Sequence, residues 1–147
     1  MSQKEIKEIL HRSHSVAIIG LSDKVGKPSH RVAAYLKKHS FHIIPVNPLI
    51  DNVLGEKSYS SLTDIPINIQ KTIDIIDIFR KSENVPPIIE QAIELKNQLG
   101  RPCVIWMQRG IINLDAAQAA HQAGFEVIMD KCIMDEHIHL RQESSNT

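Results

Sequence analysis

The residues best suited to chemistry in this chain follow its first strongly apolar segment. The run Val16–Gly20 ends in glycine and leads through Lys24 and Lys27 to Pro28 and Ser29. Pro28 is well placed to open a helix, because the first position of a helix needs no N–H donor. A turn from a buried strand into a helix directs N–H groups and the positive end of the helix dipole toward an anion. The pattern predicts an anion-binding turn, and an ordinary solvated helix cap is the alternative.

Two common phosphate-binding motifs do not fit this turn. Five residues separate Gly20 from Gly26, one more than a nucleoside triphosphate P-loop has. Pro28 also stands where that loop needs a hydroxyl for Mg²⁺. The dinucleotide motif G-x-G-x-x-G is absent, because Leu21 and Ser22 follow Gly20 directly. The turn therefore needs a different ligand, or a different way of holding one.

The residues that follow the second apolar segment, 41–46, indicate which nucleotide would fit. Asn47 and Pro48 stand where an NAD-binding fold carries a carboxylate for the ribose. An amide does not repel a phosphate on that ribose, so NADP is easier to accept than NAD. An NADP-linked oxidoreductase, or another nucleotide-binding enzyme, stays open as an alternative, although the chain has no Tyr-x-x-x-Lys pair.

These residues must be positioned by alternating strands and helices. Continuous apolar runs predict buried parallel strands, and proline openings with amphipathic spacing predict helices between them. The expected strands are 16–20, 41–46, 73–79, 103–107 and 125–129, with a short edge strand within 55–62; the expected helices begin at Pro28, Pro86 and Asp115. Such alternation indicates an α/β, Rossmann-like three-layer fold, with a mostly parallel sheet and helices on both faces.

The whole chain, 1–147, is the size of one domain. Ser2 is a candidate N-cap for a leading helix within 1–14, and 141–147 reads as a polar tail that frays. The formal net charge is zero and aromatic residues make up 4%, which argues against a nucleic-acid partner. Apolar runs are too short to span a membrane, and two distant cysteines without a secretory signal favour the cytoplasm.

Several motifs in a fixed order resemble one family, the small stand-alone CoA-binding proteins. These proteins are similar to the N-terminal CoA-binding domain of the succinyl-CoA synthetase α subunit. The resemblance extends over roughly 16–140 of the sequence. It is carried by Gly20-Leu-Ser22, Pro28-Ser29, Pro45-Val-Asn-Pro48, Gly55-Glu-Lys57 with Tyr59, Asp74-Ile-Ile-Asp-Ile-Phe-Arg80, Trp106-Met-Gln-Arg-Gly110 and Asp130-Lys-Cys-Ile-Met134 with Glu136-His137.

The resemblance implies a Rossmann-like sheet of order 3-2-1-4-5-6, with coenzyme A across the carboxyl ends of its strands. The pyrophosphate would then be held by the first turn, the adenosine part would lie beside the end of the second strand, and the neighbouring strand would line the crevice. By position, the residues that would hold the pyrophosphate are Gly20, Leu21, Ser22, Pro28 and Ser29. Asn47 and Pro48 would flank the adenosine part, and Phe79 and Arg80 would line the crevice. Lys24 adds charge to the same turn, although that stretch varies within the family.

Gln108 and Gly110 end the strand at Trp106, on the side of the sheet where a pantetheine arm would run; a plain turn is the alternative. Trp106 itself is expected in the core, since it lies inside an apolar strand. Asp77, nearer its strand end than Asp74, is the better candidate for holding loop N–H groups.

No residue set in the sequence supports catalysis or metal binding. Cys132, beside Lys131, is a candidate for thiol exchange, but a structural role is the favoured interpretation. The eight histidines are scattered and form no ligand set. We therefore expect a protein that binds CoA or an acyl-CoA without catalysis, as a carrier, sensor or accessory subunit, with a protein partner or a second copy of itself as companion. An interaction module that uses an anion only for stability is a third alternative.

Overall fold

A computed structural model describes residues 1–100 and 104–145 of the chain. Its elements are α1 (Gln3–Arg12), β1 (Ser15–Ile19), α2 (Pro28–Lys38), β2 (His42–Val46), β3 (Asn52–Val53), β4 (Glu56–Lys57), η1 (Leu62–Asp64), α3 (Ile67–Gln70), β5 (Ile75–Ile78), η2 (Ser82–Asn84), α4 (Val85–Leu99), β6 (Val104–Met107), α5 (Leu114–Gln122), β7 (Glu126–Ile128) and α6 (Ile133–Ser145). The first residue expected in β6, Cys103, lies outside the described residues.

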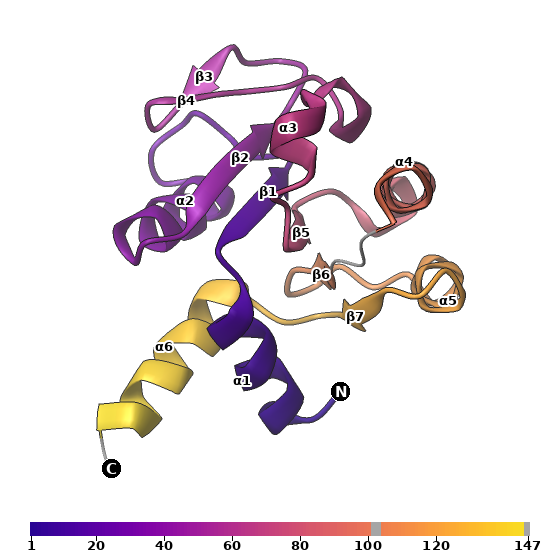
Figure 1. The fold of residues 1–147 in the computed structure, drawn as a ribbon. Coiled ribbons are helices and arrows are strands. Elements are labelled where there is room, and N and C mark those ends of the chain that lie inside the picture. Colours follow the sequence, from indigo (N-terminus) through magenta and orange to yellow (C-terminus); the bar gives the residue numbers. More distant parts are fainter. Residues whose placement is uncertain (101–103, 146–147) are drawn as a thin grey trace.

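The main sheet has five parallel strands in the order β2-β1-β5-β6-β7. Helices α1, α2 and α6 pack on one face, and α4 and α5 pack on the other, each over its own apolar core (Figure 1). The strands β1, β5 and β6 are buried along their whole length, because both faces are covered. The α/β, Rossmann-like fold class expected from the sequence is confirmed.

The third strand implied by the resemblance is reduced to a single residue pair. Tyr59 forms one parallel bridge with Val46, outside any named strand. Its N–H donates to the Pro45 carbonyl, and its own carbonyl accepts the Asn47 N–H. The neighbouring β3 and β4 form a separate two-stranded hairpin. The order 3-2-1-4-5-6 thus survives only if the Tyr59 bridge is counted as a strand.

Local signals explain where several helices begin and end. Ser2 caps α1 as expected, and with Glu5 it forms a capping box. Pro28 is the first residue of α2, and Gly100, in the left-handed conformation, caps α4. These local signals therefore set the start of α1, the start of α2 and the end of α4.

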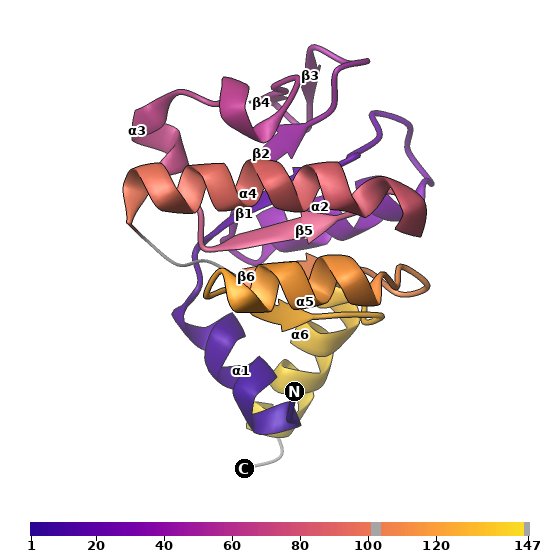
Figure 2. The ribbon, with the colours of Figure 1, turned by 90° about the vertical axis from the view of Figure 1, so that its right-hand side faces the viewer.

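The C-terminal segment differs from expectation. Helix α6 continues through residue 145, so residues 141–145 are helical instead of forming a polar tail that frays. Apolar positions hold the helix to the rest of the domain: Ile133 and Leu140 are buried in the same core as α1 and α2. Helices α1 and α6 lie side by side and are in contact (Figures 1 and 2). These contacts stabilise a helix that the polar sequence alone did not indicate. Among the described residues, no helix combines the length and apolar character needed to cross a bilayer.

Candidate functional site

The turn after β1 lies at the point where the strand order reverses. Strand β1 has β2 on one side and β5 on the other, so the loops that leave β1 and β5 diverge there. The loops after β1 and β6 project from the same edge of the sheet (Figure 2). This edge is the carboxyl edge, where open α/β sheets form ligand crevices.

Gly20 is held by the strands on both sides. Its N–H donates to the Val46 carbonyl at 2.8 Å, and the next strand closes over it, since Phe79 N–H donates to the Ile19 carbonyl. The backbone of Gly20 has φ +86°, and a Cβ placed there would lie 2.4 Å from the Phe79 carbonyl oxygen. Only glycine fits this combination of conformation and close approach.

Two serines stabilise the turn from inside. The Ser22 N–H donates to Ser29 Oγ at 2.9 Å, and the Lys24 N–H donates to Ser22 Oγ at 3.1 Å. The backbone N–H groups of Ser22 and Lys24 are therefore engaged by the turn itself. Each serine hydroxyl still carries its own hydrogen, which can be donated to an anion. Ser29 is buried, whereas the Lys24 side chain is exposed.

The start of α2 presents a positive end without a side-chain cap. Lys27 occupies the N-cap position and makes no capping hydrogen bond, Pro28 follows it, and the first turn contains no acidic residue. An uncapped N-terminus of an eleven-residue helix favours a negative ligand. Lys27 and Pro28 are both exposed, so the end of the helix is open to solvent.

Asn47 anchors the turn in place. Its Nδ2 donates to the Leu21 carbonyl at 3.0 Å, and its Oδ1 accepts the Leu49 N–H at 3.0 Å. Asn47 is buried, and Leu21 is fully buried in the core. The amide therefore positions the loop, and the buried side chain of Leu21 supports it from below.

A cavity of about 330 Å³ opens on the β2 side of the turn. Pro48 and Arg80 line it, together with apolar residues at the ends of β1 and β2 and on α4. Sequence reasoning missed four polar contributors, because none of them belongs to a motif: Ser60, Ser61, Asn84 and Gln91.

A second cavity, of about 250 Å³, opens on the other side. It is lined by Pro28, Phe79 and Gln108, which come from three different segments, and also by Arg31 and Met134. Phe79 and Arg80, adjacent in sequence, thus line separate cavities. Of the predicted binding residues, Pro48 and Arg80 line the first cavity, and Pro28, Phe79 and Gln108 line the second. The other predicted residues line neither of these two cavities: Gly20, Leu21, Ser22, Lys24, Ser29, Asn47 and Gly110.

The segment after β6 is more structural than expected. Gln108 is buried, and its Oε1 accepts the Ile133 N–H at 3.1 Å, which fixes the start of α6. The Gly110 N–H donates to an Asp130 carboxylate oxygen at 2.7 Å. Gly110 does not line either cavity. Of this pair, the side chain of Gln108 is the one placed beside a ligand crevice.

The prediction that Asp77 holds loop N–H groups is wrong. Asp77 is fully buried in β5, level with Ile18 and Trp106, and neither carboxylate oxygen has a hydrogen-bond partner. Desolvation by burial raises the pKa of Asp77 well above its ordinary value of 3.8. Asp74 makes the backbone contacts instead, at the other end of the strand, where its carboxylate accepts the N–H groups of His14 and Ser15.

Trp106 and Cys132 lie between the sheet and α6. Trp106 is fully buried, as predicted, and its indole N–H donates to the Lys131 carbonyl at 2.8 Å. Cys132 is partly buried, is not in a disulfide, and lines the cavity beside Phe79. Among the described residues, no group of three or more histidine, cysteine or acidic side chains is arranged to hold a metal ion.

Comparison with known proteins identifies the family. A family model described as a CoA binding domain matches residues 14–138. The chain belongs to this family of CoA-binding domains. The match includes the turn after β1 and the ends of all five main strands, so the resemblance found in the sequence motifs is confirmed.

Relatives of this CoA-binding domain include a protein of similar length and segments of much longer enzymes. An uncharacterized protein of Bacillus subtilis, YneT, is 42% identical over 136 residues, which covers 92% of this chain and 94% of the relative. An ADP-forming acetate–CoA ligase of Archaeoglobus fulgidus is 44% identical over 61 residues, which covers 40% of this chain but only 9% of that enzyme.

Solved structures show the same fold for this CoA-binding domain. A hypothetical protein from Pyrococcus horikoshii superposes with a TM-score of 0.86 at 35% identity, covering 96% of this chain and 93% of that one. A protein from Thermus thermophilus superposes with a TM-score of 0.85 at 28% identity, covering 95% and 99%.

Proposed function

We propose that this protein binds coenzyme A or an acyl-CoA through the pyrophosphate, at the turn between β1 and α2. The observation that carries the proposal is the arrangement of one anion-attracting turn between two cavities. CoA has the same plan, since a diphosphate joins an adenosine part to a pantetheine arm. The turn supplies the uncapped end of α2, and the cavities of about 330 and 250 Å³ lie on its two sides.

Each proposed contact follows from where the side chain lies. The hydroxyls of Ser22 and Ser29 can donate to the diphosphate, and Lys24 and Lys27 can neutralise its charge. Arg80, in the cavity that Pro48 also lines, is placed for the adenosine part and its phosphate. The pantetheine arm would then enter the cavity beside Phe79 and Gln108.

The role that fits this geometry is binding without catalysis. The carboxyl that lines the cavity beside Phe79 is Asp135, which is paired with Arg109, whereas Asp77 is fully buried and lines neither cavity. Among the described residues, neither cavity contains a histidine or an acid–base pair that could move a proton at a thioester. The protein would serve as a carrier or sensor of CoA, or as an accessory subunit for a partner enzyme.

Calorimetric titration tests the proposal. CoA, acetyl-CoA, NADP, NAD and ATP are compared, with inorganic phosphate as the probe for plain anion binding. We expect CoA or acetyl-CoA to bind at least about tenfold more tightly than NADP. A preference for NADP would favour the oxidoreductase alternative, and equal thermal stabilisation by phosphate and by CoA would favour an interaction module.

An arginine variant tests the location. Arg80→Met should weaken CoA binding by about tenfold to a hundredfold, the value of one charge-assisted hydrogen bond. The matched control is Arg12→Met, because Arg12 pairs with Glu126 at the far end of the domain. Equal affinities in the two variants would show that CoA does not use the cavity beside Arg80.

A further inference from the structure

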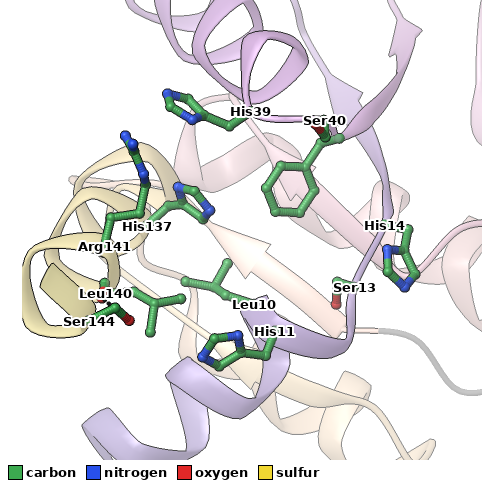
Figure 3. A pocket seen from close by; sticks show the side chains of 11 residues that line it. Leu10, His11, Ser13, His14, His39, Ser40, His137, Leu140, Arg141 and Ser144 are labelled. Carbon is green, nitrogen blue, oxygen red and sulfur yellow. Dashed lines mark hydrogen bonds between the residues drawn. The ribbon is translucent and has the colours of Figure 1, made fainter. Parts of the chain in front are cut away.

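A third cavity lies at the opposite end of the sheet from the proposed CoA site. It has a volume of about 410 Å³ and opens where α1 leads into β1, where α2 leads into β2, and along one side of α6 (Figure 3). His14, just before β1, and Phe41, just before β2, both line it. The amino-terminal edge of the sheet therefore carries a hollow that the CoA site does not use.

The lining of this cavity is rich in groups that can carry positive charge. His11 and His14 come from the α1 end, His39 follows α2, and His137 and Arg141 project from α6. Figure 3 shows His39, His137 and Arg141 gathered on one side, with His14 across from them. Scattered histidines in the sequence are thus assembled by tertiary structure into one basic cluster.

The described residues that line the cavity are basic, hydroxyl-bearing or apolar. The lining contains no aspartate or glutamate among the described residues. Two acidic groups nearby have partners: Glu143 forms an ion pair with Lys7, and Asp74 accepts the backbone N–H groups of His14 and Ser15. Two other acidic residues, Glu8 and Glu136, lie on the same helices as His11 and His137 and do not line the cavity. Lys38, close to His39, adds further positive charge.

The two histidines at the centre of the cluster are held in fixed positions. Their ring centroids are 5.6 Å apart, and the Tyr35 ring packs against His39 with centroids 4.2 Å apart and a tilt of 41° between the ring planes. The Tyr35 hydroxyl lies 2.7 Å from His137 Nδ1, and Phe41 meets the His137 ring edge-on at 5.4 Å. A hydroxyl can donate to a neutral imidazole or accept from an imidazolium, so this contact permits either charge state of His137.

The electrostatics of the histidine pair favour an anion. Desolvation, with the charges of Arg141 and Lys38, lowers the pKa of His39. Desolvation, with His39, Arg141 and His11, lowers the pKa of His137. An anion placed among these groups would offset the repulsion and raise both pKa values, because an opposite charge favours the protonated form.

Shape and polarity limit the size of the ligand. The buried side chains of Leu10, Phe41 and Leu140 form an apolar floor, and the serine hydroxyls of Ser40 and Ser144 lie at the rim. The volume is within the range of small-molecule sites, and it is lined by too few apolar groups for a lipid chain. Such a site suits a small, highly charged molecule with a short carbon skeleton.

We propose that this cavity binds a small multivalent anion, an organic phosphate or a polycarboxylate, and that His39 and His137 take up protons when it binds. Arg141 and His14 would contact the anion from the two sides, with the apolar floor beneath its carbon atoms. The site is independent of the proposed CoA function, since the two sites share no lining residue.

Titration with sulfate tests the proton uptake, because the charge of sulfate is constant near neutral pH. Histidine ring signals are followed by NMR, and binding heats are measured in buffers of different ionisation enthalpy. We expect the signals of His39 and His137 to shift, and affinity to fall between pH 6.5 and 7.5 by up to about tenfold for each proton taken up. Binding without pH dependence, or shifts spread over all exposed histidines, would overturn the proposal.

Variants and further probes locate the site. His137→Gln should weaken sulfate binding several-fold, whereas the control His121→Gln, on exposed α5, should not. Pyrophosphate and citrate, compared at one pH, distinguish a phosphate ligand from a carboxylate one. Pyrophosphate bound at the turn after β1 is recognised because it leaves the His137 signal unchanged. Equal affinity of all probes for the two variants would overturn the proposal even if the CoA titrations succeed.

Discussion

The buried carboxyl of Asp77 predicts an unusual dependence of stability on pH. Asp77 is fully buried without a hydrogen-bond partner, so the folded protein holds its proton well above pH 3.8, whereas the unfolded chain releases it near that value. Unfolding therefore releases a proton at pH values between the two pKa values. The contribution of this group to stability is complete below pH 3.8 and is lost as pH rises toward the folded-state pKa.

The magnitude follows from linkage. Each pH unit between the two pKa values lowers the free energy of unfolding by about 1.4 kcal/mol. Each such unit is a sizeable share of the ~5–15 kcal/mol that stabilises a typical domain. His39 and His137, whose pKa values are lowered, make the free energy of unfolding rise with pH instead, because the folded state binds fewer protons at these residues than the unfolded chain does.

The variant Asp77→Asn isolates this effect, because an amide has nearly the same shape and does not titrate. Urea unfolding of the wild type and the variant is measured from pH 5 to pH 8. We expect the difference in unfolding free energy to move in favour of the variant as pH rises, by about 1.4 kcal/mol per unit until the folded-state pKa is reached. The exposed Asp51→Asn is the control, since it removes the same charge without changing the core. Parallel curves for wild type and Asp77→Asn would refute the argument.

Three further substitutions test the turn and the leading helix. Gly20→Ala should destabilise the fold by at least ~1–3 kcal/mol and abolish CoA binding, because the new Cβ would meet the Phe79 carbonyl at 2.4 Å; an unchanged melting temperature would contradict this. Asn47→Ala removes two hydrogen bonds, one of them to Leu21, and should cost about 1–3 kcal/mol in urea unfolding and weaken CoA binding; intact affinity in calorimetry would show that the loop does not need this anchor. Ser2→Ala should cost about 1 kcal/mol by thermal unfolding and leave CoA affinity unchanged.

The fold was predictable wherever one physical signal dominated. Buried parallel strands between two helix layers must be apolar throughout, and the runs at Val16–Ile19 and Ile75–Ile78 showed this directly. Proline at the first position of α2 and glycine at the end of α4 marked their boundaries for equally local reasons. The short edge strand expected within 55–62 was overestimated, because Tyr59 forms only a single bridge, with Val46 of β2.

The sequence by itself determined the layered fold, the turn after β1 and the family, since apolar runs, turn residues and ordered motifs are local properties of the chain. Only the tertiary structure decided what individual side chains do. It assigned Asn47 to the loop and Asp77 to the core, divided Phe79 and Arg80 between two cavities, and joined His39 to His137 across the domain. Contacts between residues far apart in sequence leave no local pattern, because packing brings them together only when the sheet and its helices are assembled.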